Sequence, residues 1–399
     1  MRFFIHLRIT HEIWGGDLGV IHSLRDGLIE IGHEVVMDEQ LGKSLDCDIV
    51  FLTNSCQDKQ AEAAFLESHG KRYFVLTFHE DFLGYMPSCM GFCEHISGLM
   101  KNQINLPVPA TLDYLEQNPS IIRYYKPTIK LSGVANGVVL NKAIEVYPSS
   151  RFEAKTLLRD APQCQAKIVL LPTERTDWNV YSNESNFSQM YNIPEGYIIQ
   201  VGRLEPRKNQ IGSVLATRDI ERPLVFVASS GGPGWYHNLL ANVILRYRKH
   251  PTYIIAQSID SLERGPLTIR RMHDGKKLPS NVLRSAYLGA SLNLHPAFHE
   301  LPGLTYIESI SLGIPTVCSS WTGISDYIVG ETRDRGVEFV SPESLVEIRD
   351  ASLRALNSTL PIGAFLPKIS LSRFALEIAA NVTQAIDSHN DTRIGRGVN

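Results

Sequence analysis

The sequence has no long apolar run, no closely paired cysteines and little net charge. No run approaches the roughly 20 apolar residues that a membrane helix needs, and the amino terminus turns polar at His6, too early for a secretory signal. A net charge of −3 gives no general electrostatic case for binding nucleic acid. The six cysteines form no Cys-x-x-Cys pair, which favours a reducing compartment. We therefore expect a cytoplasmic protein with at most peripheral contact with the inner face of a membrane.

The length of the chain predicts two domains, because 399 residues exceed what one hydrophobic core usually serves. Short apolar runs alternate with helix-like stretches throughout, which predicts an α/β fold with parallel sheets. The expected strands of the first domain, residues 1–178, are Phe3–Ile9, Glu34–Met37, Asp48–Leu52, Tyr73–Phe78, Gly137–Leu140 and Ile168–Leu171.

A polar, aperiodic stretch at 179–195 interrupts this alternation and predicts a linker. Alternation resumes over 196–370, the second predicted domain. Its expected strands are Tyr197–Val201, Leu224–Ala228, Tyr253–Ala256, Ser291–Leu294, Thr316–Cys318 and Val337–Val340. We expect a helix at 371–388 that packs back on the first domain, followed by a flexible tail at 389–399.

Two polar clusters follow predicted strands of the first domain, where parallel sheets bind ligands. Gly15 and Gly16 lie between the first strand and its helix, and paired glycines allow a phosphate close to the helix amino terminus. A tight turn would explain these glycines equally well. His79 follows the run Tyr73–Phe78; it either has a structural role or contacts a sugar hydroxyl from its strand end.

The segment from Gly202 to Asn209 directly follows the predicted strand Tyr197–Val201. Arg203 and Lys208 flank a turn there and are suited to grip one diphosphate from two sides, Arg203 through bidentate contacts and Lys208 as a point charge. The alternative is a solvated charged loop. Position at a strand end favours the binding site.

Two glutamates stand eight positions apart around the next strand end. Glu300 follows Ser291–Leu294, and Glu308 lies about one turn inside the following helix, within reach of a ribose. Gly303 permits an approach to the amino terminus of that helix, whose N–H groups suit a phosphate. The alternative is a loop acid and an exposed helix acid, but Glu308 stands between Ile307 and Ile310, an unusual setting for a surface residue.

Together these residues resemble the retaining glycosyltransferases of family 4. The Glu-x7-Glu element from Glu300 to Glu308, the later Gly313-Ile314-Pro315, and Gly202–Asn209 carry the likeness, which extends over nearly the whole chain. The resemblance implies the GT-B fold, two Rossmann-like doubly wound domains that face a cleft. Leu301-Pro302-Gly303 departs from the family's frequent Gly-Phe-Gly.

The resemblance also implies roles and partners. The implied donor-binding residues are Gly15, Gly16, Arg203, Lys208, Gly303, Leu304, Thr305 and Glu308. The implied catalytic residues are Glu300, His79, Arg203 and Lys208. The donor would be a nucleoside-diphosphate sugar, and the acceptor a glycan, a lipid-linked molecule or a small molecule. Neither a cofactor nor a metal is implied, and the oligomeric state stays open.

Three alternative functions remain open at this point. Asp46-Cys47-Asp48 has the Asp-x-Asp pattern of metal-dependent glycosyltransferases, but it begins a predicted strand, so we expect it away from the ligand edge. A sugar-nucleotide epimerase or a phosphorylase would share the fold. A catalytically inactive nucleotide-sugar-binding or scaffolding subunit is the third alternative. The joint presence of the two cations and two glutamates argues against it.

Overall fold

The protein forms two compact units that the chain enters alternately. The computed structural model describes residues 1–7, 16–101, 137–174, 178, 186–229, 232–257, 259–272, 278–332 and 334–394. Unit 1 comprises Met1–Asp81, Ile129–Glu174 and Pro367–Asn399, and unit 2 comprises Phe82–Thr128 and Arg175–Leu366.

Unit 1 is built on a five-stranded parallel sheet of order β2-β1-β3-β4-β5. The strands are β1 (Arg2–His6), β2 (Glu34–Asp38), β3 (Ile49–Thr53), β4 (Phe74–Leu76) and β5 (Val146–Tyr147). The strands β3, β4 and β5 are fully buried, as is typical of parallel sheets covered on both faces, whereas the edge strand β2 has no buried residue. Phe3, Phe51, Phe74 and Tyr147 form a contiguous aromatic row on one face.

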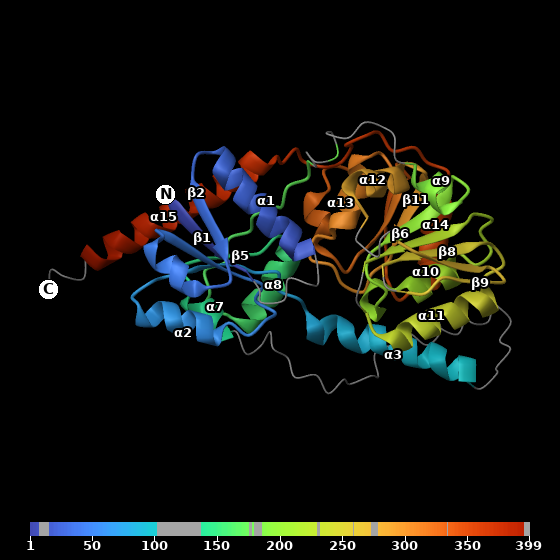
Figure 1. Cartoon of the computed structure of the whole chain (residues 1–399), viewed down its shortest axis with the longest axis horizontal. Helices are drawn as coiled ribbons and strands as arrows, with labels where there is room; N and C mark the ends of the chain where they lie inside the picture. Colours follow the sequence, from blue (N-terminus) through green and yellow to red (C-terminus); the bar gives the residue numbers. More distant parts are fainter. Residues whose placement is uncertain are drawn as a thin grey trace. The chain divides into compact units, whose positions relative to one another are not determined.

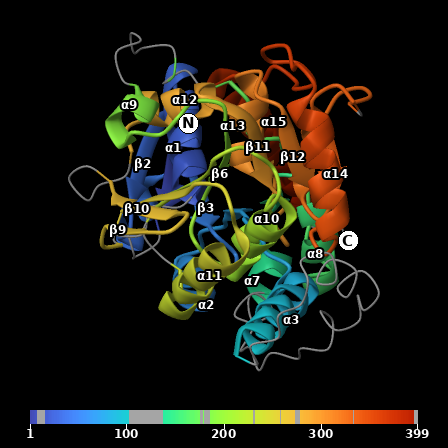
Figure 2. The same ribbon diagram turned by 90° about the vertical axis from the view of Figure 1, so that its right-hand side faces the viewer.

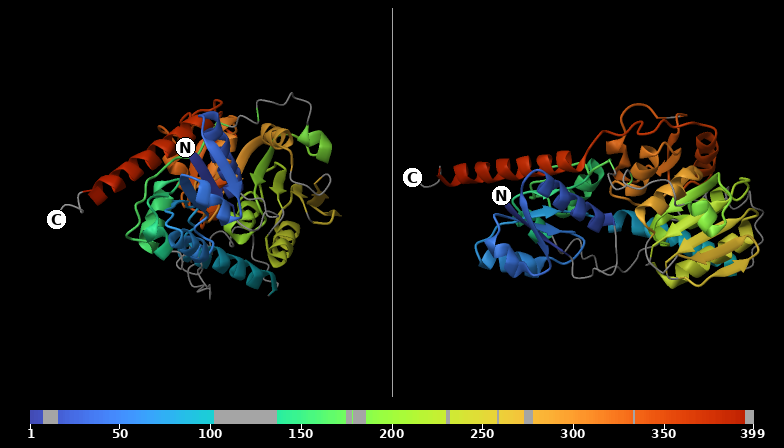
Figure 3. Two further views of the ribbon diagram at one scale, coloured as in Figure 1. Left: turned by 60° about the vertical axis from the view of Figure 1, so that its left-hand side comes forward. Right: turned by 45° about the horizontal axis from the view of Figure 1, so that its top comes forward.

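Helices cover both faces of this sheet (Figure 1). The helices and the 3-10 turn are α1 (Gly16–Glu30), η1 (Leu41–Asp46), α2 (Gln60–Ser68), α7 (Gly137–Lys142), α8 (Arg151–Asp160) and α15 (Leu371–Ile394). The carboxyl-terminal helix α15 runs along α1 (Figure 3), and a Cβ at Gly27 would lie 2.5 Å from the Leu371 carbonyl oxygen. This close approach explains why a glycine stands on the buried side of α1.

Unit 2 contains an eight-stranded sheet of order β13-β12-β11-β6-β7-β8-β10-β9, parallel except for the edge strand β9. The strands are β6 (Tyr197–Val201), β7 (Leu224–Ala228), β8 (Thr252–Ala256), β9 (Leu262–Arg264), β10 (Leu267–Arg271), β11 (Ala290–His295), β12 (Thr316–Ser319) and β13 (Val337–Val340). The six strands expected from the sequence are all present, and β9 and β10 were not expected.

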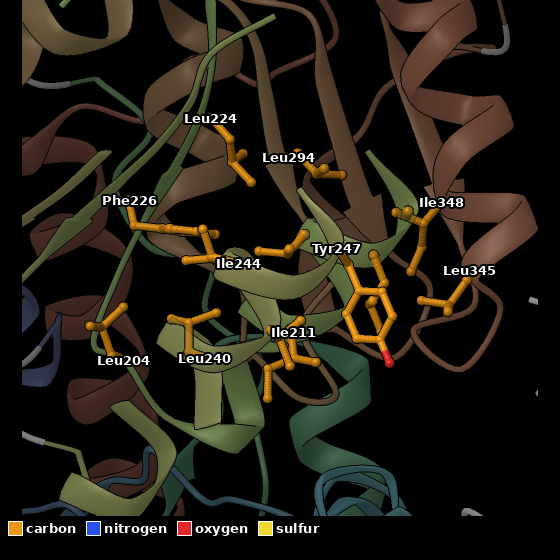
Figure 4. Packing of buried hydrophobic residues seen from close by; sticks show 14 of the residues in the cluster. Leu204, Ile211, Leu224, Phe226, Leu240, Ile244, Tyr247, Leu294, Leu345 and Ile348 are labelled. Atoms are coloured by element: carbon orange, nitrogen blue, oxygen red, sulfur yellow. The ribbon is translucent and has the colours of Figure 1, made fainter. Parts of the chain in front are cut away.

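Each face of this sheet carries its own hydrophobic cluster. The helices and 3-10 turns of the unit are α3 (Phe82–Lys101), α9 (Phe187–Tyr191), η3 (Pro206–Lys208), α10 (Gln210–Ala216), α11 (Gly234–Tyr247), α12 (Ser280–Leu288), α13 (Leu304–Ser311), η5 (Gly323–Tyr327) and α14 (Leu345–Leu356). Residues of α3, α10, α11 and α14 fill one cluster, and residues of α9 and α12 the other (Figures 2 and 4).

The structure differs from the sequence expectations in two elements of unit 1. Gly137–Leu140 belongs to helix α7 rather than to a strand, and the fifth strand is Val146–Tyr147. Ile168–Leu171 is not a strand either, although the neighbouring Ala166 forms an isolated bridge with Val146. A short apolar run reads equally well as a buried helix or strand, and tertiary pairing decides between them.

The unit boundaries also differ from the predicted ones. Within the expected linker, residues 179–185 lie outside the described part, and 186–195 include α9, whose Phe187 and Tyr191 are buried in unit 2. Helix α3 falls within the predicted first domain, yet it packs in unit 2. Helix α15 continues to Ile394, into the segment expected to be a flexible tail.

No helix among the described residues is both long enough and apolar enough to cross a membrane.

Candidate functional site

The polar residues singled out in unit 2 meet where the strand order of its sheet reverses. From β6 the chain builds outward through β7, β8 and β10, and then returns to place β11 on the other side of β6. Adjacent loops diverge at such a switch point and leave a crevice at the carboxyl ends of the strands, where open α/β sheets bind their ligands. The loop after β6 carries Arg203 and Lys208, and the loop after β11 carries Glu300.

Lys208 and Glu300 form an ion pair across this switch point. The Lys208 Nζ donates a hydrogen bond to the Glu300 carboxylate, and the two side chains are only 11% and 12% exposed. His295, at the end of β11, places its Nε2 3.5 Å from the same carboxylate oxygen. The site thus brings together Lys208, predicted to grip a diphosphate, and Glu300, one of the implied catalytic residues.

The arginines of this loop share a second acid. The Glu205 Oε1 accepts from Arg207 Nη2 at 2.9 Å and from Arg203 Nη2 at 3.3 Å. Arg207 Nη1 also lies 3.9 Å from Glu300, whereas the Arg203 side chain is 36% exposed. Arg203 is therefore the more accessible of the two guanidinium groups for an external anion.

The surroundings set the charge states of the site. Burial by itself would raise the pKa of Glu300, but the Lys208 and Arg207 charges hold the pKa of this carboxyl well below its usual value. Burial lowers the pKa of His295, so its imidazole is neutral near pH 7. Burial also lowers the pKa of Lys208. The site therefore combines an ionised carboxylate, a neutral imidazole and a lysine that has already lost most of its hydration.

A network of buried amides fixes the loop that carries the cations. Asn209 adopts a left-handed conformation at the start of α10, and its Nδ2 donates to the Pro296 and Pro342 carbonyls at 3.0 and 2.9 Å. Gln200 Nε2 donates to the Lys208 carbonyl at 2.7 Å, and Gln210 Nε2 donates to the Arg203 carbonyl at 2.7 Å. These bonds hold the backbone on both sides of the turn.

The amino terminus of α13 opens beside Glu300. Its first turn follows Gly303, which has a φ of 80° and makes no side-chain capping bond. A Cβ at Gly303 would meet the Tyr306 ring at 2.3 Å, so both conformation and packing require glycine here. The first N–H groups of a helix have no intrahelical partner, and Leu304 and Thr305 supply two of them. This end of the helix is suited to an anion.

Glu308 lies on the same helix and is 7% exposed. Its Oε2 accepts a hydrogen bond from the Tyr287 hydroxyl at 3.0 Å. The side chain is thus oriented by α12, rather than solvated as an ordinary surface acid of a helix would be.

Unit 1 has its own switch point, between β1 and β3. Asn54 follows β3 with a φ of 64°, and its Nδ2 donates to the Asp17 Oδ2 at 3.1 Å in the first turn of α1. Gly16 begins α1 and is exposed, whereas Gly15 lies outside the described residues. Gly16 thus stands at the first residue of α1, and residues 8–15 before it lie outside the described part of the chain.

His79 has a structural environment, in contrast to the expectation that it faces a ligand. Its side chain is fully buried, its Nδ1 lies 2.9 Å from the Ser55 hydroxyl, and its Nε2 lies 2.9 Å from the Asp160 carboxylate. The His79 backbone N–H donates to Glu153 at 2.7 Å. Because both ring nitrogens are engaged within unit 1, His79 is not retained among the candidate catalytic residues.

The Asp-x-Asp pattern lies at the opposite edge of the unit 1 sheet. Asp46 ends η1, and Asp48 immediately precedes β3 and accepts from the Arg2 backbone N–H at 2.7 Å. Across the part of the chain that the structure describes, no group of three or more histidine, cysteine and acidic side chains is arranged to hold a metal ion.

Three residues of the site escaped sequence analysis: Arg207, Glu205 and His295. Arg207 was within the charged segment but received no role, because spacing alone cannot tell which side chain turns toward Glu300. His295 ends an apolar strand. The one signal that could have identified it is its position at the carboxyl end of that strand.

Comparison with solved structures identifies the class of fold. Sucrose-phosphate synthase from Thermosynechococcus elongatus superposes with a TM-score of 0.59 at 12% identity, covering 97% of this chain and 99% of that one. HepE from Anabaena, in complex with UDP and glucose, gives 0.51 at 13% identity over 96% and 99%. The catalytic domain of starch synthase IV from Arabidopsis thaliana, bound to ADP and acarbose, gives 0.51 at 11% identity over 89% and 91%. With its two largely parallel α/β sheets, the chain has the GT-B fold, which it shares with these structures.

Sequence comparison adds one relative at lower coverage. The O-antigen chain mannosyltransferase B of Escherichia coli is 28% identical over 174 residues, which are 41% of this chain and 39% of that protein. The match thus spans well under half of either protein. No protein-family model matches the chain.

Proposed function

We propose that this protein is a retaining glycosyltransferase that moves a sugar from a nucleoside-diphosphate sugar to an acceptor hydroxyl. The observation that carries the proposal is the Lys208–Glu300 pair at the switch point of unit 2, beside Arg203 and the amino terminus of α13. The GT-B fold, the UDP and ADP complexes among its structural neighbours and the partial likeness to a mannosyltransferase support it.

The donor diphosphate would bind between the loop after β6 and the start of α13. Arg203 would offer its accessible guanidinium, and Lys208 would turn from Glu300 toward the phosphate oxygens. The backbone N–H groups of Leu304 and Thr305, reached past Gly303, would complete the anion site. Glu308 would accept hydrogen bonds from the ribose hydroxyls while Tyr287 fixes its orientation.

The chemistry that these groups favour is departure of a nucleoside diphosphate. As the bond between the anomeric carbon and the phosphate oxygen breaks, negative charge grows on the phosphate and positive charge on the sugar. Arg203, Lys208 and the helix N–H groups would stabilise the leaving phosphate in place of a metal ion. Glu300, ionised and beside the transferred sugar, would stabilise the sugar cation.

Retention of configuration follows if the acceptor attacks from the face that the diphosphate leaves. The acceptor oxygen then bonds to the anomeric carbon, and its proton passes to the departing phosphate oxygen. Glu300 is held by Lys208, Arg207 and His295, so it is better suited to stabilise charge than to act as a covalent nucleophile. Net retention distinguishes this proposal from an inverting transferase of the same fold.

The acceptor in this proposal is a glycan, a lipid-linked molecule or a small molecule. The name of the E. coli relative makes a mannose donor and a growing polysaccharide chain the first pair to test. A non-catalytic nucleotide-sugar-binding subunit would keep the donor site without turnover, so product formation separates these two functions.

The test is a thermal-shift screen of UDP, GDP, ADP and dTDP sugars, followed by NMR of the product's anomeric proton. We expect one donor to raise the melting temperature of the wild type but not of Lys208→Ala, and the new linkage to keep the donor's anomeric configuration. A wild type that binds no nucleotide sugar would refute the proposal, and inverted product would refute retention.

A further inference from the structure

Helix α3 belongs to unit 2, although it follows a strand of unit 1 in the chain. It begins at Phe82, directly after the β4 segment of unit 1, yet its apolar side is part of the core of unit 2. The buried residues recur at helical spacing: Tyr85, Cys89, Phe92, Cys93, Ile96 and Leu99. They share a cluster with Leu204 of the loop after β6 and with Phe298 of the loop after β11. The helix therefore packs against both loops that carry the candidate donor site.

Two aromatic contacts link α3 to the loop that ends in Glu300. The Tyr85 ring stacks on the His299 ring with centroids 4.8 Å apart and an interplanar angle of 16°. About two turns further along, Phe92 packs against Phe298 with centroids 6.2 Å apart. His299 and Phe298 are both at most 1% exposed, so the two residues before Glu300 are enclosed by this packing.

The same two residues are hydrogen-bonded to the cationic loop. The Phe298 backbone N–H donates to the Arg207 carbonyl at 2.8 Å, and Arg207 Nη1 donates to the His299 carbonyl at 3.3 Å. Displacement of His299 would therefore shift Arg207 and the neighbouring Lys208 together with Glu300. Stacking on Tyr85 acts on both halves of the ion-paired site.

A buried polar contact fixes α3 along its axis. Ser88 is 4% exposed, and its Oγ donates to the Glu343 Oε1 at 2.9 Å, just before α14. Apolar packing alone would tolerate small slides of the helix, but this bond sets the position at which Tyr85 meets His299.

We propose that α3 positions the donor site and that Tyr85, through His299, is a positioning residue for Glu300 and Lys208. The proposal rests on the proposed glycosyltransferase function for its catalytic readout. Transition-state stabilisation depends on placement of charges to a fraction of an ångström, so a loop that loses its support loses rate before it loses its fold.

The experiment compares three Tyr85 variants and one control variant of the full chain with the wild type. Tyr85→Ala removes the stacked ring, Tyr85→Leu removes it but keeps apolar volume, and Tyr85→Phe keeps it. Tyr191→Ala is the matched control, because Tyr191 is another buried tyrosine of unit 2 that packs, with tilted rings, against an aromatic neighbour, Phe187, in a different hydrophobic cluster. Donor turnover is measured as kcat and KM, and backbone hydrogen exchange is measured for the peptide containing Phe298.

We expect Tyr85→Ala and Tyr85→Leu to lower kcat about 10- to 100-fold, because misplacement by about 1 Å is enough for a loss of that order. The KM for the donor should change by less, and the peptide containing Phe298 should exchange faster. Tyr85→Phe should keep both kcat and the hydrogen exchange of this peptide near the wild-type values. Tyr191→Ala should melt at a lower temperature with kcat and exchange near those of the wild type.

Unchanged exchange and unchanged kcat in folded Tyr85→Leu would overturn the proposal, as would equal losses in Tyr191→Ala. Hydrogen exchange needs no substrate, so it tests α3 even if the wild type transfers no sugar. Absence of transfer in the wild type would instead count against the proposed function.

Discussion

Lys208 and Glu300 neutralise each other across the switch point of unit 2, from loops that lie 92 residues apart in the chain. A donor diphosphate that binds Lys208 has to compete with this carboxylate. In return, the pair holds a lysine and a glutamate in a nearly buried site before any substrate arrives.

Loss of Lys208 should affect both stability and rate. Lys208→Ala leaves Glu300 nearly buried with a more distant arginine as its partner, and breaking a buried pair costs about 3–5 kcal/mol. Turnover should also fall roughly 100- to 1,000-fold, as for loss of one group aimed at developing charge. The double variant Lys208→Ala/Glu300→Gln should regain part of the lost melting temperature but not the turnover. The control is Lys142→Ala, which breaks the exposed pair with Glu67 and should change neither.

Arg203 should behave differently from Lys208. Its side chain is 36% exposed and shares Glu205 with Arg207, so Arg203→Ala should leave the melting temperature nearly unchanged. Turnover should still fall about 100-fold or more, because a donor of hydrogen bonds to the leaving phosphate is lost. Arg203→Lys should recover only part of the rate, since the bidentate fork is missing. Wild-type rates in Arg203→Ala would place the diphosphate elsewhere.

The two glutamates should separate binding from chemistry. Glu308 is fixed by Tyr287 on a helix and would hold the ribose in ground and transition states alike, so Glu308→Gln should weaken nucleoside diphosphate affinity in calorimetry. Glu300→Gln should leave that affinity largely unchanged and lower kcat. Tyr287→Phe should resemble Glu308→Gln in direction with a smaller effect. The reverse pattern would exchange the two roles.

Activity should not require a divalent metal ion. Cationic side chains and helix N–H groups would stabilise the leaving phosphate, and Asp46 and Asp48 lie at the amino end of β3, away from the ligand edge. Turnover should survive excess EDTA, and the double variant Asp46→Asn/Asp48→Asn should remain active. Complete loss with EDTA that manganese restores would contradict this expectation.

The His295 imidazole should remain neutral below the usual pKa of histidine. Burial is the largest influence and lowers the pKa of His295, so the ring should not gain a proton as pH falls through about 6.5. NMR of isotope-labelled histidine, assigned with His295→Asn, should show a flat His295 signal from pH 7.5 to 6. Because the unfolded chain binds this proton more readily, unfolding should become easier as pH falls below about 6.5, by up to about 1.4 kcal/mol per pH unit. A midpoint at 6.5 or above would contradict this placement.

The strands next to the site were predictable because each is an apolar run followed by a polar turn. Tyr197–Val201 ends at Gly202 and Ser291–Leu294 ends close to Glu300, so the meeting of their loops followed from the rule for parallel sheets. The loop contacts were not predictable, because which of Arg203 and Arg207 turns toward Glu300 depends on Glu205 and on the His299 carbonyl.

Helix α3 shows why a visible pattern was not recognised. Its buried residues recur at helical spacing, but Pro87 and three glycines, Gly84, Gly91 and Gly98, are interspersed among them and have low helix propensity. Burial against unit 2 outweighs those local preferences. The opposite happened at His79, where position after a strand suggested a ligand contact and tertiary bonds to Ser55 and Asp160 occupy the ring.

Because the chain alternates between the two units, the order of synthesis restricts when each unit can complete its folding. Unit 1 lacks α15, its helix alongside α1, until residues 371–394 have been synthesised, and α3 emerges before any strand of unit 2 that it will pack against. Neither unit can thus be completed before the other is largely made. The apolar side of α3 packs in a cluster that includes residues of helix α14. More than two hundred further residues must be synthesised after α3 before that cluster can be complete. Cutting the chain at any one point where it passes between the units separates segments that belong together in unit 1.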